Sequence, residues 1–138
     1  MRNIFLVCLT CLLLAGPATH QIQSANSKKP KLTLTAYPRQ GFGPMHVSIN
    51  GKLENVEKHD KEFYCLQEEW EFGDGAVSSE QANCEEFSEG SEVKVQFFAE
   101  HVYEDAGSYT IWLTLGDHKI RSNQITVVVL ESDISKQH

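Results

Sequence analysis

Apolar and polar residues alternate along most of this chain, and this alternation limits the fold more than any other feature. From residue 32 to residue 129, apolar positions recur with a period of two in short stretches. Turn residues such as Asn50-Gly51, Asp74-Gly75 and Gly116-Asp117 separate these stretches. A period of two is typical of strands that bury one face, whereas an amphipathic helix needs an apolar stripe. We therefore predict an all-β protein, a β-sandwich of about seven short antiparallel strands.

Each predicted strand is defined by its alternating apolar residues. In the third strand, Trp70 and Phe72 share one parity and should face the core, whereas Glu69 and Glu71 should face water. The segment Ala76–Ser91 is polar and acidic, and we expect a long surface excursion there. The predicted strands are Leu32–Ala36, Met45–Ile49, Tyr64–Phe72, Val93–Phe97, Tyr109–Leu115 and Ile125–Val129.

The N-terminal residues have the composition of an export signal. Arg2 is the only charge before Lys28, and the apolar run Ile4–Ala15 is shorter than the ~20 residues that span a bilayer. Small residues place the expected cleavage after Ala18 or Ala25, and an uncleaved anchor is the alternative. The mature protein would then be secreted, into the extracellular space or the periplasm, without membrane insertion. We expect a signal peptide over 1–25, a flexible lead-in over 26–30, one domain over 31–130 and a loose tail over 131–138.

The cysteines indicate one disulfide bond. Cys8 and Cys11 lie within the export signal, so Cys65 and Cys84 are the pair expected in the mature protein. In an oxidising compartment such a pair is expected to form a disulfide, which contributes about 3 kcal/mol in the chain-entropy model. A metal site is the alternative, but two thiols without a nearby pair of histidines are too few ligands.

The charge balance of the chain excludes some partners. The sequence has 12 Lys and Arg against 19 Asp and Glu, a formal net charge of −7. Loss of Arg2 with the signal would leave 11 − 19 = −8. An acidic chain of this kind is not expected to bind nucleic acid or anionic membranes by charge.

Three stretches of the chain follow one another in a recognisable order. They are Ala36-Tyr37-Pro38 with Gly41, Pro44 and Val47; Trp70-Glu71-Phe72-Gly73-Asp74-Gly75; and His101-Val102-Tyr103 with Gly107, Tyr109, Ile111, Leu113 and Leu115. In this order they resemble the PKD domain family. The resemblance implies an immunoglobulin-like β-sandwich, present here in a single copy, over roughly Lys31–Leu130. It also implies a non-catalytic extracellular module, of a kind often attached to secreted hydrolases or surface proteins, that contacts proteins or polysaccharides.

The residues that carry the resemblance have mainly architectural roles. Asp105, Gly107 and Tyr109 resemble the tyrosine corner that braces one end of such sandwiches. The position two residues after that tyrosine is Ile111, so the predicted disulfide is not the intersheet bridge of antibody domains. Cys65 has the opposite parity to Trp70 and is expected on the outer face, where it would pin the long loop to the sheet. The structural motif residues are Trp70, Phe72, Gly73, Asp74, Gly75, Tyr103, Gly107 and Tyr109.

Trp112 is the candidate binding residue. It lies between Ile111 and Leu113, so strand alternation turns its ring away from the core. An outward aromatic ring can stack on sugars or anchor a protein interface, or it can simply be covered by its neighbours. The predicted partner is an extracellular protein or a polysaccharide, and a docking role for the acidic Cys84 loop on a secreted enzyme is a further alternative.

No catalytic residue and no cofactor is assigned. Calcium is considered because Asp60, Asp74 and Asp105 offer oxygen ligands, but their spacing is not diagnostic. The acidic side chains are expected on solvated faces and loops, and the histidines are too scattered to indicate zinc. These acidic side chains are Glu68, Glu69, Glu71, Glu85 and Glu86, and the histidines are His46, His59, His101 and His118.

Overall fold

The computed structural model describes residues 28–116 and 120–132. The predicted export signal with Cys8 and Cys11 lies outside the described residues, as do His118 and most of the predicted tail. The first strand begins at Lys31 and the last ends at Leu130. No helix in the described residues is long and apolar enough to cross a membrane.

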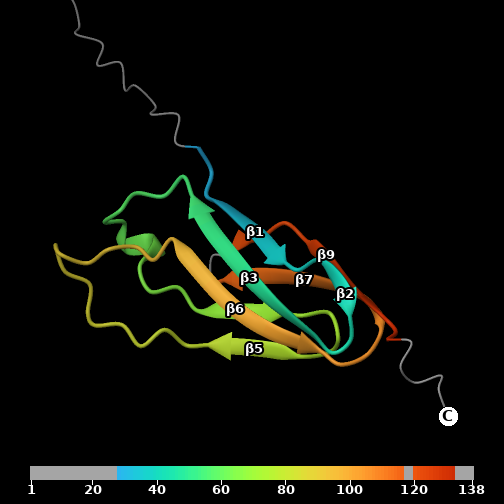
Figure 1. Cartoon of the computed structure of the whole chain (residues 1–138). Helices are drawn as coiled ribbons and strands as arrows, with labels where there is room; N and C mark the ends of the chain where they lie inside the picture. The colour runs from blue at the N-terminus through green and yellow to red at the C-terminus, as the bar shows by residue number, and fades with distance from the viewer. Residues whose placement is uncertain (1–27, 117–119, 133–138) are drawn as a thin grey trace, which may run out of the picture.

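The described residues form two β-sheets packed face to face, which confirms the predicted all-β sandwich (Figure 1). One sheet has the strand order β1-β3-β6, and the other has the order β2-β9-β7-β4-β5 with β8 paired to β7. All pairs are antiparallel except β2 with β9. The strands are β1 Lys31–Tyr37, β2 Gln40–Phe42, β3 Met45–Glu54, β4 Glu68–Glu71, β5 Val77–Glu80, β6 Gln96–Tyr103, β7 Gly107–Leu115, β8 Ile120–Arg121 and β9 Ile125–Leu130, with a 3-10 helix η1 at Lys61–Phe63.

The core lies between the sheets and consists of the side chains of every second residue in the long strands, which point inward. Alternation in β7 buries Ile111, Leu113 and Leu115 completely, and the same period holds in β3 and β9. Burying a side chain of this size contributes about 1.5–3 kcal/mol, so these strands dominate the stability of the sandwich. The largest fully buried side chains are Tyr103, Phe97, Ile49, Ile111, Leu113, Leu115, Val47 and Val127.

The turn predicted at Asn50-Gly51 is wrong, because β3 continues through it to Glu54. Gly51 pairs with Leu34 of β1, and a Cβ there would lie 3.2 Å from side-chain atoms of Leu34 and Leu113. The glycine is therefore needed for packing between the sheets rather than for chain reversal.

The third predicted strand is shorter than the alternation indicated, and the fourth begins later and continues to Tyr103. The strand predicted over Tyr64–Phe72 is only Glu68–Glu71, since Cys65 adopts a positive φ of 60° before it. The parity argument that placed Cys65 on the outer sheet face therefore does not apply. The strand predicted over Val93–Phe97 starts at Gln96, although Val93 is still buried from the preceding loop.

Candidate functional site

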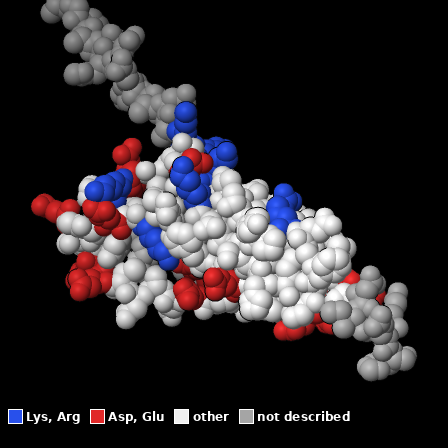
Figure 2. All heavy atoms as spheres, viewed as in Figure 1, with Lys and Arg blue, Asp and Glu red and all other residues white. Residues whose placement is uncertain are grey.

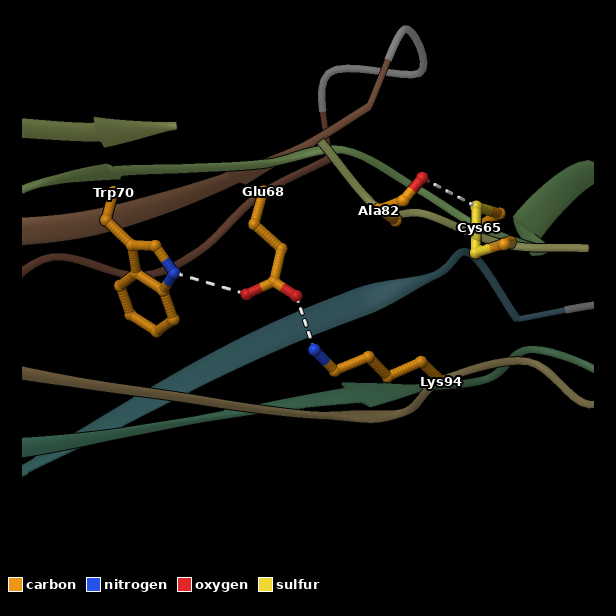
Figure 3. Close-up of polar contacts among 6 residues, drawn as sticks. Cys65, Glu68, Trp70, Ala82 and Lys94 are labelled. Atoms are coloured by element: carbon orange, nitrogen blue, oxygen red, sulfur yellow. Dashed lines mark hydrogen bonds and ion pairs between the residues drawn. A yellow bond between two sulfur atoms is a disulfide. The ribbon is translucent and has the colours of Figure 1, made fainter. Parts of the chain in front are cut away.

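A carboxylate is buried beside the tryptophan of β4. Glu68 is 4% exposed, and one of its oxygens accepts a hydrogen bond from the Trp70 indole N–H at 3.2 Å. The other oxygen lies 2.5 Å from the Lys94 ammonium, which comes from the loop before β6 (Figure 3). The expectation that Glu68 lies on a solvated face is wrong. Its parity, which is that of Trp70, was the signal for burial.

Two long loops are stapled together beyond one end of the sheets. The predicted Cys65–Cys84 disulfide is present and joins the β3–β4 connection to the β5–β6 connection (Figure 3). The Tyr64 hydroxyl donates to the Glu85 carbonyl at 3.1 Å, and its ring meets Phe87 edge to face. The disulfide therefore pins one loop to another loop, whereas the sequence indicated a link to the sheet.

The predicted surface excursion is also more structured than expected. It contains β5, which pairs with β4 along all four of its residues. Beyond β5, the backbone N–H of Val93 donates to the Lys58 carbonyl at 2.8 Å, and Lys58 forms a 2.7 Å ion pair with Glu92. These contacts join the two loops at further points beyond the disulfide.

The opposite end of the sandwich is braced by the motif residues. Phe72 stacks on His101 with a ring separation of 4.1 Å, and Tyr103 stacks on Tyr109 at 4.4 Å. The Tyr103 hydroxyl donates to the Phe72 carbonyl at 2.7 Å, and burial raises the pKa of Tyr103. The Tyr109 hydroxyl donates to the Asp105 carbonyl at 2.9 Å, as in a tyrosine corner.

Asp74 and His101 form the closest acid–base pair of this end. The distance from His101 Nε2 to Asp74 Oδ2 is 2.6 Å, and Asp74 also accepts the Ala76 amide at 3.0 Å. Burial disfavours the charged form of Asp74, but these hydrogen bonds and the His101 charge outweigh it and lower its pKa. Gly73 has a φ of 85°, and a Cβ there would lie 2.5 Å from the Thr110 carbonyl oxygen. The motif is therefore a brace between the sheets.

Trp112 faces outward as predicted but is partly buried by its neighbours. Its indole N–H donates to the Glu71 carboxylate, and the Arg121 guanidinium lies 4.5 Å from its ring centroid. Arg121 also approaches Glu71 at 3.8 Å. The polar edge of the ring and one of its faces are thus already engaged within the protein.

Two of the three candidate calcium ligands have partners within the protein. Asp60 caps η1 by accepting the Glu62 amide at 2.9 Å, and Asp74 pairs with His101. Among the residues that the structure describes, no group of three or more His, Cys, Asp or Glu side chains could hold a metal ion.

An open groove runs between the edges of the two sheets, beside β5 and β6. This β5–β6 groove has a volume of about 650 Å³. Phe98 and Val77 border it and are 65% and 62% exposed, although neither was predicted as a site residue. The adjacent Phe97-Phe98 was the available signal, because alternation must turn one of the two rings outward. The groove is lined by Ala76, Val77, Ser78 and Glu80 on one side, by Phe98, Ala99, Glu100 and His101 on the other, and by Trp70 and Phe72 from the interior.

Comparison with known proteins points to one family. The model of the PKD domain matches residues 56–130, which is more than half of the chain. Among solved structures, the chain is similar to the PKD domain of an M14-like peptidase from Thermoplasmatales archaeon SCGC AB-540-F20. The two share 16% identity with a TM-score of 0.46, over 76% of this chain and 98% of the archaeal one. No curated protein shows significant similarity to the chain.

Proposed function

The chain belongs to the PKD domain family, and on that premise we propose that it is a non-catalytic binding module that makes protein–protein contacts outside the cytoplasm. PKD domains are non-catalytic modules, so function here means recognition. The Cys65–Cys84 disulfide supports an oxidising compartment, because structural disulfides persist in secreted and periplasmic proteins.

The observation that carries the proposal is the exposed apolar surface of the β5–β6 groove. Phe98 and Val77 border this groove from its two sides, with their side chains on the outer faces of their sheets, and both are more than half exposed. Exposed apolar side chains that line one concave surface and are bordered by polar residues are typical of interaction sites. Asp74 and His101, the acid–base pair at the other end of the sandwich from the disulfide, are accounted for by their bracing role.

The polysaccharide alternative depends on Trp112. A ring that stacks on sugar needs a free face, and Arg121 lies over one face of Trp112. The accessory or inhibitor alternative depends on the acidic residues of the Cys84 loop, such as Glu85, Glu86 and Glu89, which are exposed. Neither alternative is supported by an exposed apolar groove, so we prefer the protein-binding function.

A capture experiment separates these three functions. The mature chain is incubated with secreted proteins of its source in the presence of a lysine-reactive crosslinker, and in parallel with insoluble cellulose, chitin and starch. We expect a discrete crosslinked protein that excess unlabelled chain displaces, and no retention on the polysaccharides.

Two variants identify the alternatives in the same experiment. Retention on a polysaccharide that Trp112→Ala abolishes would replace the proposal with carbohydrate binding. Loss of the crosslinked protein on combined Glu85→Gln, Glu86→Gln and Glu89→Gln substitution would assign binding to the acidic loop. The absence of any displaceable protein would contradict the proposed function itself.

A further inference from the structure

The edge strands of the two sheets differ in how far their unpaired main-chain groups are covered. An unpaired edge strand presents main-chain N–H and C=O groups that can pair with another chain, and proteins usually cover or interrupt such edges. At the β1 edge the Asn123 side chain takes up both main-chain groups of Leu34, accepting from the N–H at 2.7 Å and donating to the carbonyl at 3.5 Å. Strand β2 is only three residues long.

Strand β6 is by contrast a long edge without such protection in the described part of the chain. It has eight residues, pairs only with β3, and contains neither proline nor lysine. Strand β5, the end strand of the other sheet, pairs only with β4. Both open edges border the β5–β6 groove, and β5 and β6 run along the same side of the molecule (Figure 1).

The register shows which main-chain groups of β6 point away from β3 and have no partner strand among the described residues. The Leu53 N–H donates to the Val95 carbonyl at 2.8 Å, and Leu53 and Val95 continue the β3–β6 pairing. In an antiparallel ladder, hydrogen-bonded pairs occur at every second residue. Odd-numbered residues of β6 therefore face β3, and Phe98 and Glu100 direct their N–H and C=O groups away from it.

The same reasoning applies to the shorter edge of β5. The Phe72 N–H donates to the Ala76 carbonyl at 3.2 Å, and this pair continues the register of β4 with β5. Val77 and Ser79 consequently direct their main-chain groups away from β4. An extended chain beside β6 would thus find free hydrogen-bonding groups along it and the exposed side chain of Val77 across the groove.

The charges of the groove indicate what kind of chain fits. Glu80 and Glu100 line it and are exposed, whereas no lysine or arginine is among its lining residues. His101, its remaining titratable residue, is held by Asp74. Acidic side chains also lie along the lower border of the molecule in Figure 2, the side on which β5 runs in Figure 1.

We propose that the β5–β6 groove binds an extended, basic segment of a partner protein, which adds to β6 as a further strand. This inference rests on the proposed protein-binding function and names its site. Main-chain hydrogen bonds to Phe98 and Glu100 would supply the pairing. Side chains of the segment on the outer face of the sheet would contact the Phe98 ring and Glu100, and those on the inner face would approach Glu80. Lysine or arginine on either face would pair with the glutamate of that face.

The test uses a random dodecapeptide display library as the probe and three single substitutions. Phe98→Pro removes the outward N–H but leaves the β3 ladder intact, because proline is tolerated on the open side of an edge strand. Phe98→Ala is its matched control and keeps that N–H. Glu100→Lys inverts the charge without changing the main chain. Thermal unfolding confirms that each variant is folded before binding is measured.

We expect peptides enriched on the wild-type chain to combine Lys or Arg residues with an apolar residue two positions from a basic one, which places that apolar residue beside Phe98 and the basic one beside Glu100. Their affinity should fall at least about tenfold in Phe98→Pro and several-fold in Glu100→Lys, while Phe98→Ala should bind more tightly than Phe98→Pro. Bound peptide should slow hydrogen exchange of the Phe98 and Glu100 amides.

Three results would overturn the inference. One is peptides that bind Phe98→Pro as tightly as the wild type, and another is acidic peptides enriched in place of basic ones. The third is a concentration-dependent dimer of the chain that Phe98→Pro dissociates, which would assign the edge to a second copy. If the crosslinked partner protein persists in Phe98→Pro, the protein-binding function stands and only this site is rejected.

Discussion

Replacement of Glu68 by alanine is the substitution whose effect the structure defines most closely. The carboxylate is 4% exposed and accepts the Trp70 indole N–H, so its removal leaves a buried donor without an acceptor. That loss costs about 1–3 kcal/mol. The one buried methylene that is removed, Cγ, adds about 0.8 kcal/mol. Lys94 contributes little, because its side chain is 56% exposed and its ammonium can return to water.

The free energy of unfolding should therefore fall by about 2–4 kcal/mol in Glu68→Ala. Glu68→Gln, which keeps an acceptor for Trp70, should lose about 1 kcal/mol, and Lys94→Met should lose less than that. Urea unfolding followed by tryptophan fluorescence measures all three. If Glu68→Ala costs no more than Lys94→Met, the reasoning that gives Glu68 a buried structural role is refuted.

Three further predictions concern the loops, the brace and the outer face. Removal of the Cys65–Cys84 bridge by double substitution to alanine should lower the unfolding free energy by about 3 kcal/mol, from the 19-residue separation it closes; an unchanged urea midpoint would contradict this. The lowered pKa of Asp74 in the folded state contributes stability that is present above the ordinary aspartate pKa and is lost as pH falls through the folded value. Acid titration should show this loss below about pH 4, and Asp74→Asn should remove it; an identical acid profile in that variant would rule out the contribution. Trp112→Ala should leave partner capture unchanged, because the indole is engaged by Glu71, and a lost partner would place Trp112 in the interface.

The sequence predicted those parts of the fold in which local pattern and packing agree. Strands β7 and β9 alternate strictly and form where expected, with Ile111, Leu113 and Leu115 fully buried. The disulfide followed from counting the cysteines outside the predicted export signal. The tyrosine corner at Tyr109 was expected from the family resemblance, and its hydrogen bond is present.

The errors arose where tertiary packing outweighs local pattern. Asn50-Gly51 reads as a turn, yet Gly51 is required where Leu34 and Leu113 pack over β3. The charge of Glu68 favours a surface position, whereas its position in the strand, two residues before Trp70, turns its side chain inward beside that ring. Edge strands cannot be identified without the strand order, so the open side of β6 and the exposure of Phe98 are evident only in the structure.

Hydrogen exchange of individual amides along β6 tests the central claim most directly, because it reports which N–H groups are bonded in the free protein. Phe97, Ala99 and His101 should exchange slowly, since their N–H groups face β3. Phe98 and Glu100, between them, should exchange fast because their N–H groups face the open groove. Uniformly slow exchange along the strand would show that the edge is already occupied and would contradict the account.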